Sequence, residues 1–154
     1  MREDLQCTND SILIPALRIE DDSFDAFGIA EAPSPYQLND LAFRRRWLES
    51  RGLPTRFLAT YSVRGDAMAP TIEAGDLLLV ALRHSKEAIQ LPEEGIHLIR
   101  LDGHIQVKRL QSDGHGGLLI KSDNPSYETV QLDQAHLKSL EVLGRVLWRG
   151  RTMA

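Results

Sequence analysis

The second half of the chain alternates short apolar runs with turn residues. After Pro54, six apolar segments are separated by glycine, aspartate and asparagine, which is typical of a sheet with short polar connections. Asp102-Gly103 predicts a tight hairpin turn, and residues 114–117 predict a looser one. Residues 77–80 show no alternation, so we expect their strand to be covered on both faces. The predicted strands are residues 57–63, 77–82, 96–101, 105–110, 118–122 and 142–148.

The first part of the chain has a different pattern. Residues 1–35 carry two isolated apolar patches and several prolines without a helical period, which indicates an extended N-terminal arm. Asn39 or Asp40 can cap a short helix that runs through Leu41, Phe43, Trp47 and Leu48, and Gly52 with Pro54 ends it. The sequence therefore predicts one mainly β domain over residues 36–154, with one or two short helices and a docked arm.

Composition limits the class of protein. At 154 residues with 42% apolar content, the chain suffices for one domain with a core and falls short of two. The single cysteine, Cys7, cannot form an internal disulfide, and the sequence has no apolar run long enough to span a bilayer and no signal-peptide pattern at Met1. We therefore expect a soluble, cytoplasmic protein that makes no membrane contact.

The charge and the histidine spacing give little support for nucleic-acid binding or for a metal site. The net charge of -4 and a pI near 5.7 disfavour direct phosphate binding, so we interpret Arg44-Arg45-Arg46 as a solvated helix face. The five histidines have no metal-ligand spacing, and we expect no metal and no cofactor. Asp66, Asp76 and Asp123 each adjoin glycine or asparagine, so we interpret them as turn formers rather than acid-base pairs.

The most informative stretch is Val-Arg-Gly-Asp-Ala-Met-Ala-Pro-Thr-Ile over residues 63–72, followed by Glu-Ala-Gly-Asp-Leu-Leu-Leu-Val. It resembles the nucleophile motif Gly-Asp-Ser-Met-x-Pro-Thr of the LexA-like and phage CI-type self-cleaving repressors, the S24 family of Ser-Lys peptidases. Ala67 stands at the position of the nucleophilic serine, so the attacking hydroxyl is missing while the turn remains. The resemblance implies that the backbone amides of Asp66 and Ala67 are the oxyanion donors.

Lys108, in Val107-Lys108-Arg109-Leu110, matches the family's general base. A lysine accepts a proton only as the neutral amine, and burial can lower its pKa toward that form. Taken alone, Lys108 is better explained as a surface residue of an alternating strand, because lysines are mostly exposed. Residues 122–127, Ser-Asp-Asn-Pro-Ser-Tyr, resemble the family's Ser-Asp-Asn-Pro-x-Tyr turn, and three blocks in the family's order favour the base.

The cleavage segment departs from the family pattern. Family members cut themselves at an Ala-Gly or Cys-Gly bond upstream of the serine, and residues 1–66 contain neither dipeptide, since Ala74-Gly75 lies after Ala67. Phe27-Gly28 lies at about the right place upstream of Ala67, and Ala30-Glu31 is the second candidate. An ordinary acidic linker is the alternative interpretation of this segment.

The resemblance implies the C-terminal dimerisation and self-cleavage domain of a phage-type or DNA-damage-response transcriptional repressor, held uncleavable by Ala67. It also implies a LexA/signal-peptidase-like coiled β fold and activation by the RecA filament or another co-protease. We expect a homodimer, because residues 142–148 carry more apolar side chains than one sheet face needs. DNA would be bound only through an absent N-terminal helix-turn-helix, since residues 1–15 are too few to form one.

Two alternatives remain open. A UmuD-like accessory subunit of a translesion DNA polymerase fits the chain length and the proline-rich residues 32–35. A natural pseudo-protease that acts only as a binding module fits Ala67. An upstream helix-turn-helix would select the repressor, and the genomic codon for residue 67 would decide whether the nucleophile is naturally absent.

Overall fold

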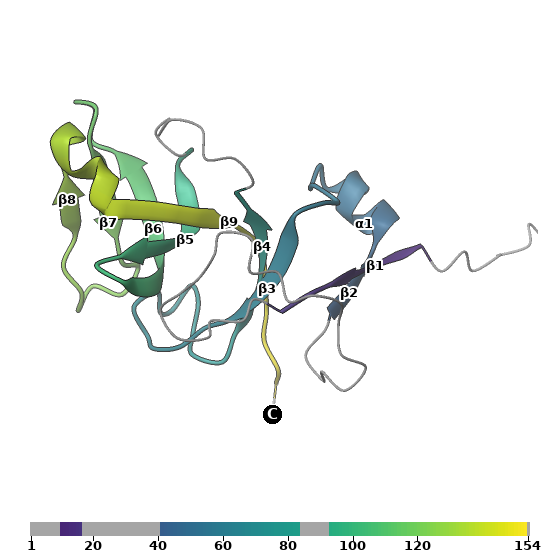
Figure 1. Cartoon of the computed structure of the whole chain (residues 1–154). Helices are drawn as coiled ribbons and strands as arrows, with labels where there is room; N and C mark the ends of the chain where they lie inside the picture. Colours follow the sequence, from purple (N-terminus) through teal and green to yellow (C-terminus); the bar gives the residue numbers. More distant parts are fainter. Residues whose placement is uncertain (1–9, 17–40, 84–92, 154) are drawn as a thin grey trace, which may run out of the picture.

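The computed structural model describes residues 10–16, 41–83 and 93–153, and its main body is an antiparallel sheet of seven strands (Figure 1). The strand order is β3-β4-β9-β5-β6-β7-β8, and a short 3-10 helix, η1 (Gln134–Ser139), leads into β9. All six predicted strands are present, so the mainly β fold class is confirmed. The strands of the sheet are β3 (Leu58–Ser62), β4 (Leu77–Leu82), β5 (Gly95–Leu101), β6 (His104–Ser112), β7 (Leu118–Lys121), β8 (Val130–Leu132) and β9 (Leu140–Gly150).

The tight turn between β5 and β6 is confirmed. Leu101 pairs with His104, which leaves a loop of two residues, and Asp102 and Gly103 both have positive φ, 52° and 77°. Two consecutive positive φ angles define the hairpin turn whose twist matches the flanking strands. The looser turn is also present, since Ser112 pairs with Leu118 across residues 113–117.

Strand β4 is buried on both faces, as its unbroken apolar run predicts. Leu78 and Val80 are fully buried in a central cluster that also holds Leu98 and Val107. Leu79, which points to the other face, is fully buried in a second cluster. Both faces of this strand therefore serve as core.

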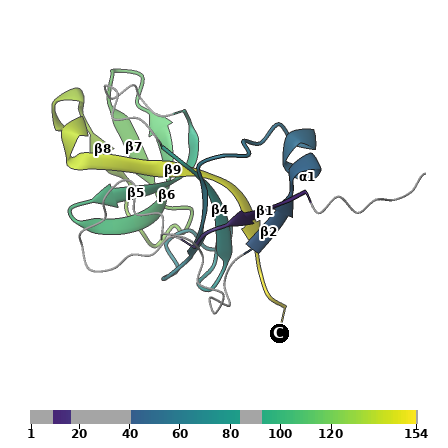
Figure 2. The same ribbon diagram turned by 45° about the vertical axis from the view of Figure 1, so that its right-hand side comes forward.

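The second cluster is closed by a small sheet of two strands, β1 (Ser11–Ile14) and β2 (Leu41–Arg44), and by the helix α1 (Arg45–Ser50). Figures 1 and 2 show this unit at the β3 end of the molecule, away from β7 and β8. Ile14 and Leu48 are fully buried there against Leu58 and Leu79. The described part of the predicted arm, residues 10–16, therefore packs on the body.

The predicted helix is wrong in its first half. Leu41–Arg44 is strand β2, paired with β1, and the N-cap of α1 is Arg44, which makes no side-chain capping bond. The capping role predicted for Asn39 or Asp40 is therefore also wrong. Apolar positions 41 and 43 fit a strand as well as a helix, and β1 supplies the strand's hydrogen-bonding partners from 27 to 33 positions earlier in the chain.

The end of the helix is confirmed. Gly52 has a φ of +66°, and its amide donates to the carbonyl of Glu49 at 3.0 Å. The amide of Leu53 donates to the carbonyl of Leu48 at 2.9 Å, which completes a Schellman motif. A glycine is suited to this left-handed position because it has no Cβ.

The C-terminal strand β9 lies inside the sheet, between β4 and β5. Leu143 and Val146 pack in the central cluster, and Leu147 and Trp148 pack in the cluster beside the small sheet. These apolar residues therefore pack on both faces of an interior strand, with Leu143 buried and the other three partly buried, so their number does not by itself require a partner. The homodimer stays a prediction that rests on the family resemblance.

Candidate active site

The loop between β3 and β4 carries Ala67 and is anchored in the core. Met68 and Ile72 are each 2% exposed and belong to the central apolar cluster. The amide of Ala69 donates to the carbonyl of Asp66 at 3.0 Å, and that of Ile72 donates to the carbonyl of Met68 at 2.9 Å. Burial of Met68 and these local bonds fix the position of the residue before it, Ala67.

The amides of Asp66 and Ala67 are available as donors. Among the residues that the structure describes, neither amide has an acceptor. Two consecutive N–H groups that no described residue accepts, at the position that the resemblance assigns to the nucleophile, match what an oxyanion hole requires. The alanine side chain does not affect them, because they belong to the backbone.

Lys108 lies on β6 and turns its ammonium group toward the turn that follows β7. Its Nζ donates to Ser122 Oγ at 2.5 Å and lies 5.2 Å from the centroid of the Tyr127 ring. Partial burial lowers the pKa of Lys108 from its ordinary value of 10.5. The shift has the direction that a general base requires.

The turn over residues 122–127 joins the Ala67 loop to Lys108. The amide of Asn124 donates to the carbonyl of Ala67 at 3.0 Å, and its side-chain Nδ2 donates to the carbonyl of Asp66 at 3.0 Å. The Tyr127 hydroxyl donates to Asp66 Oδ1 at 2.5 Å. The three sequence blocks on which the resemblance rests therefore form one hydrogen-bonded group.

Residues 25–147 match the family described as Peptidase S24-like. The chain belongs to this family. A protein of Haemophilus influenzae named as an uncharacterized HTH-type transcriptional regulator is 27% identical over 106 residues, which is 69% of this chain. The matched region is 43% of that protein, so this chain corresponds to less than half of its relative's length.

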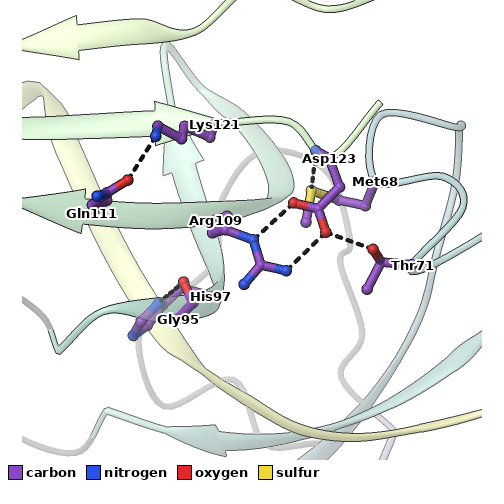
Figure 3. Close-up of polar contacts among 8 residues, drawn as sticks. All are labelled: Met68, Thr71, Gly95, His97, Arg109, Gln111, Lys121 and Asp123. Atoms are coloured by element: carbon purple, nitrogen blue, oxygen red, sulfur yellow. Dashed lines mark hydrogen bonds and ion pairs between the residues drawn. The ribbon is translucent and has the colours of Figure 1, made fainter. Parts of the chain in front are cut away.

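The S24 domain contains an aspartate whose role the sequence analysis missed. Arg109 donates to both carboxylate oxygens of Asp123 at 2.8 Å, and Thr71 Oγ1 donates to Asp123 Oδ2 at 2.6 Å (Figure 3). The Arg109 guanidinium holds the pKa of Asp123 below its ordinary value. The interpretation of the Asp123 side chain as a simple turn former is wrong, because it binds two distant residues.

The strand period could have revealed this pair. Lys108 and Arg109 are consecutive on β6, so their side chains point to opposite faces of the sheet. Ser122 and Asp123 are consecutive in the turn, and each meets one of them. The consecutive pairs Lys108-Arg109 and Ser122-Asp123 were therefore a signal in the sequence, because two consecutive basic residues on a strand can each bind one member of a nearby hydroxyl-carboxylate pair.

The turn-former interpretation explains only part of the contacts that the Asp76 side chain makes. Its Oδ2 accepts the amide of Glu73 at 2.9 Å, as a turn former does. Its two oxygens also accept Arg151 Nε at 2.7 Å and Nη2 at 2.8 Å. Chiefly because of the Arg151 bonds, and despite burial, the pKa of Asp76 falls to about 2.

Some predicted features cannot be compared with the structure. The cleavage candidates Phe27-Gly28 and Ala30-Glu31 lie outside the described residues and stay predictions. Within residues 10–16, 41–83 and 93–153, no group of three or more His, Cys, Asp or Glu side chains could hold a metal ion. In the same ranges, no helix is long and apolar enough to cross a membrane.

Proposed function

We propose that the chain is the C-terminal dimerisation and self-cleavage domain of a phage-type or DNA-damage-response transcriptional repressor, held uncleavable by Ala67. The observation that carries the proposal is the hydrogen-bonded group that joins the Ala67 loop, Lys108 and the 122–127 turn. The name of the Haemophilus influenzae relative favours a transcriptional repressor over an accessory subunit of a polymerase. Membership of the peptidase family favours self-cleavage as the regulated event.

The proposed chemistry begins with a serine at position 67. Neutral Lys108 accepts the serine proton, and the oxygen attacks the carbonyl carbon of a peptide bond in the arm. The amides at positions 66 and 67 stabilise the resulting oxyanion. The Lys108 ammonium then donates its proton to the leaving nitrogen, and water hydrolyses the ester that is left.

Two consequences follow from this scheme. Cleavage accelerates as the pH rises, because only neutral Lys108 accepts the proton and its pKa lies below 10.5. The arm and the site belong to one chain, so the reaction is intramolecular and avoids the entropy cost of an encounter, which can be worth several kcal/mol. With Ala67 in place, the serine attack cannot occur, so the domain does not cut itself and keeps only its proposed role in dimerisation.

Restoring the nucleophile tests the proposal. We expect Ala67→Ser to cut itself at alkaline pH, most readily at Phe27-Gly28, and to produce two fragments on intact-mass analysis. Adding Lys108→Ala to this variant abolishes cutting by removing the base. The matched control is Lys121→Ala, because Lys121 lies on neighbouring β7 and donates instead to Gln111 at 2.6 Å.

The outcome also separates the proposal from its alternative. A serine variant that stays intact after long incubation, with and without a RecA filament, would contradict self-cleavage and leave a pseudo-protease binding module. Cutting at Ala30-Glu31 would correct the bond while supporting the reaction. Sedimentation at micromolar concentration tests the proposed homodimer, and a single 17.3 kDa species would contradict it.

A further inference from the structure

We infer that Ser122 is a positioning residue that orients the amine of Lys108 toward the side chain at position 67. The inference deepens the proposed function and rests on it for its catalytic consequence. The contact itself is present in the Ala67 chain as it stands: Lys108 Nζ donates to Ser122 Oγ at 2.5 Å. No feature of the sequence assigned the Ser122 side chain a role.

The surroundings of the lysine head explain why this hydroxyl matters. Among the described residues, Ser122 Oγ is the hydrogen-bond acceptor of Lys108, and no carboxylate forms an ion pair with it. Asp66 accepts the Tyr127 hydroxyl, while Asp123 is held by Arg109. The carboxylates of residues 66–72 and 122–127, Asp66 and Asp123, are therefore engaged with other partners.

The strand register identifies the other titratable and charged neighbours. His97 on β5 is the direct partner of Lys108, and Arg145 on β9 is the partner of His97. His97 is 4% exposed, its Nδ1 contacts the carbonyl of Gly95, and burial lowers its pKa, which favours the neutral imidazole. Tyr127 contributes the face of its ring. Within the described structure, the hydroxyl of Ser122 therefore orients the lysine without adding a negative charge.

A hydroxyl suits this task in both protonation states of the lysine. It accepts an N–H from the ammonium, and it can rotate to donate to the neutral amine. Fixing one of the three positions on Nζ restricts rotation about the last bond of the side chain and leaves the remaining positions for the group at residue 67. A carboxylate in its place would stabilise the ammonium and raise the pKa of the base.

The first test needs no cleavage and uses the Ala67 chain. The pKa of Lys108 is measured by NMR titration of its side-chain nitrogen in the parent chain, Ser122→Ala, Ser122→Thr and the control Ser112→Ala. Because an ammonium bonds a hydroxyl more strongly than a neutral amine does, Ser122→Ala lowers the pKa of Lys108 by about one unit. Ser122→Thr restores the pKa of Lys108. Ser112→Ala leaves it unchanged, because Ser112 lies on β6 with Lys108 but at the end of the strand away from the 122–127 turn. An unchanged pKa in Ser122→Ala overturns the inference.

The second test compares pH-rate profiles of self-cleavage in the Ala67→Ser background. Ser122→Ala lowers the alkaline plateau by about tenfold, because the base is no longer oriented, and moves the apparent pKa downward. Ser122→Thr recovers both. A lower plateau with an unmoved apparent pKa and a lower unfolding temperature indicates a merely structural role and overturns the inference, as does an unchanged plateau.

The two tests separate two kinds of failure. If Ala67→Ser does not cut itself at any pH, the proposed self-cleavage fails, and the titration alone decides whether Ser122 holds Lys108. If Ala67→Ser cuts and Ser122→Ala matches it in plateau and apparent pKa, the proposed function stands and the role of Ser122 is refuted.

Discussion

Asp76 and Asp123 are two aspartates with the same partner chemistry in different places. Each carboxylate accepts two hydrogen bonds from one arginine, Arg151 for Asp76 and Arg109 for Asp123. The side chain of Asp76 is 1% exposed, whereas that of Asp123 is 14% exposed. The pKa of each is lowered, and that of Asp76 reaches about 2.

The two pairs differ in what they connect. The Asp76 pair ties the end of the chain, after β9, to the turn before β4, so it closes the fold. The Asp123 pair ties the 122–127 turn to β6 and, through Thr71, to the loop that carries Ala67. The same aspartate-arginine pairing therefore stabilises the fold at Asp76 and the geometry of the candidate site at Asp123. We expect the more buried pair to contribute more to the free energy of unfolding.

The largest expected effect comes from Asp76→Asn. The amide has nearly the same shape, but it keeps only one acceptor oxygen, so its NH2 group leaves one donor of Arg151 without an acceptor and the negative charge of the pair is lost. We expect the free energy of unfolding to fall by about 3 kcal/mol, measured by urea denaturation at neutral pH. The control is Asp102→Asn, which removes the same charge from an exposed turn residue. Equal losses in both variants would refute a special role for the buried pair.

The second effect is the dependence of stability on pH. A carboxyl whose pKa is lower in the folded state stabilises the fold above its ordinary pKa of 3.8, and this contribution disappears as the pH falls through about 2. For Asp76 it amounts to about 2 kcal/mol. The stability difference between the parent chain and Asp76→Asn should therefore narrow between pH 4 and pH 2. A constant difference over this range would contradict the lowered pKa.

The smallest effect on stability is expected for Asp123→Asn. Because Asp123 and Arg109 are partly exposed, water replaces some of the lost interaction, and we expect a loss of about 1 kcal/mol. In the Ala67→Ser background, however, self-cleavage should slow by about tenfold, because the turn is no longer braced against the nucleophile loop. Comparing the rate ratio with the change in unfolding free energy separates the two roles. A stability loss as large as that of Asp76→Asn would end the distinction between the two aspartates.

The strand predictions were correct where the local sequence pattern fits only one type of secondary structure. Residues 77–82 form β4 with the predicted bounds, because an unbroken apolar run between turn residues fits a strand with two buried faces. The pattern of residues 41–44 fits two types of secondary structure, because Leu41 and Phe43 fit either a helix or a strand. Pairing with β1 decided between them, and pairing with a distant segment is not a local property.

By itself, the sequence determined the mainly β fold, the family, and the positions of Ala67 and Lys108. These features depend on residue order within short blocks, where spacing and side-chain type suffice. Only the tertiary structure decided the partners: Ser122 for Lys108, Arg109 and Thr71 for Asp123, and Arg151 for Asp76. Residues 76 and 151 are 75 positions apart, and such a contact depends on the path of every strand between them. The physical reason is that local periodicity fixes which face a side chain takes, while the packing of the whole sheet fixes what lies opposite that face.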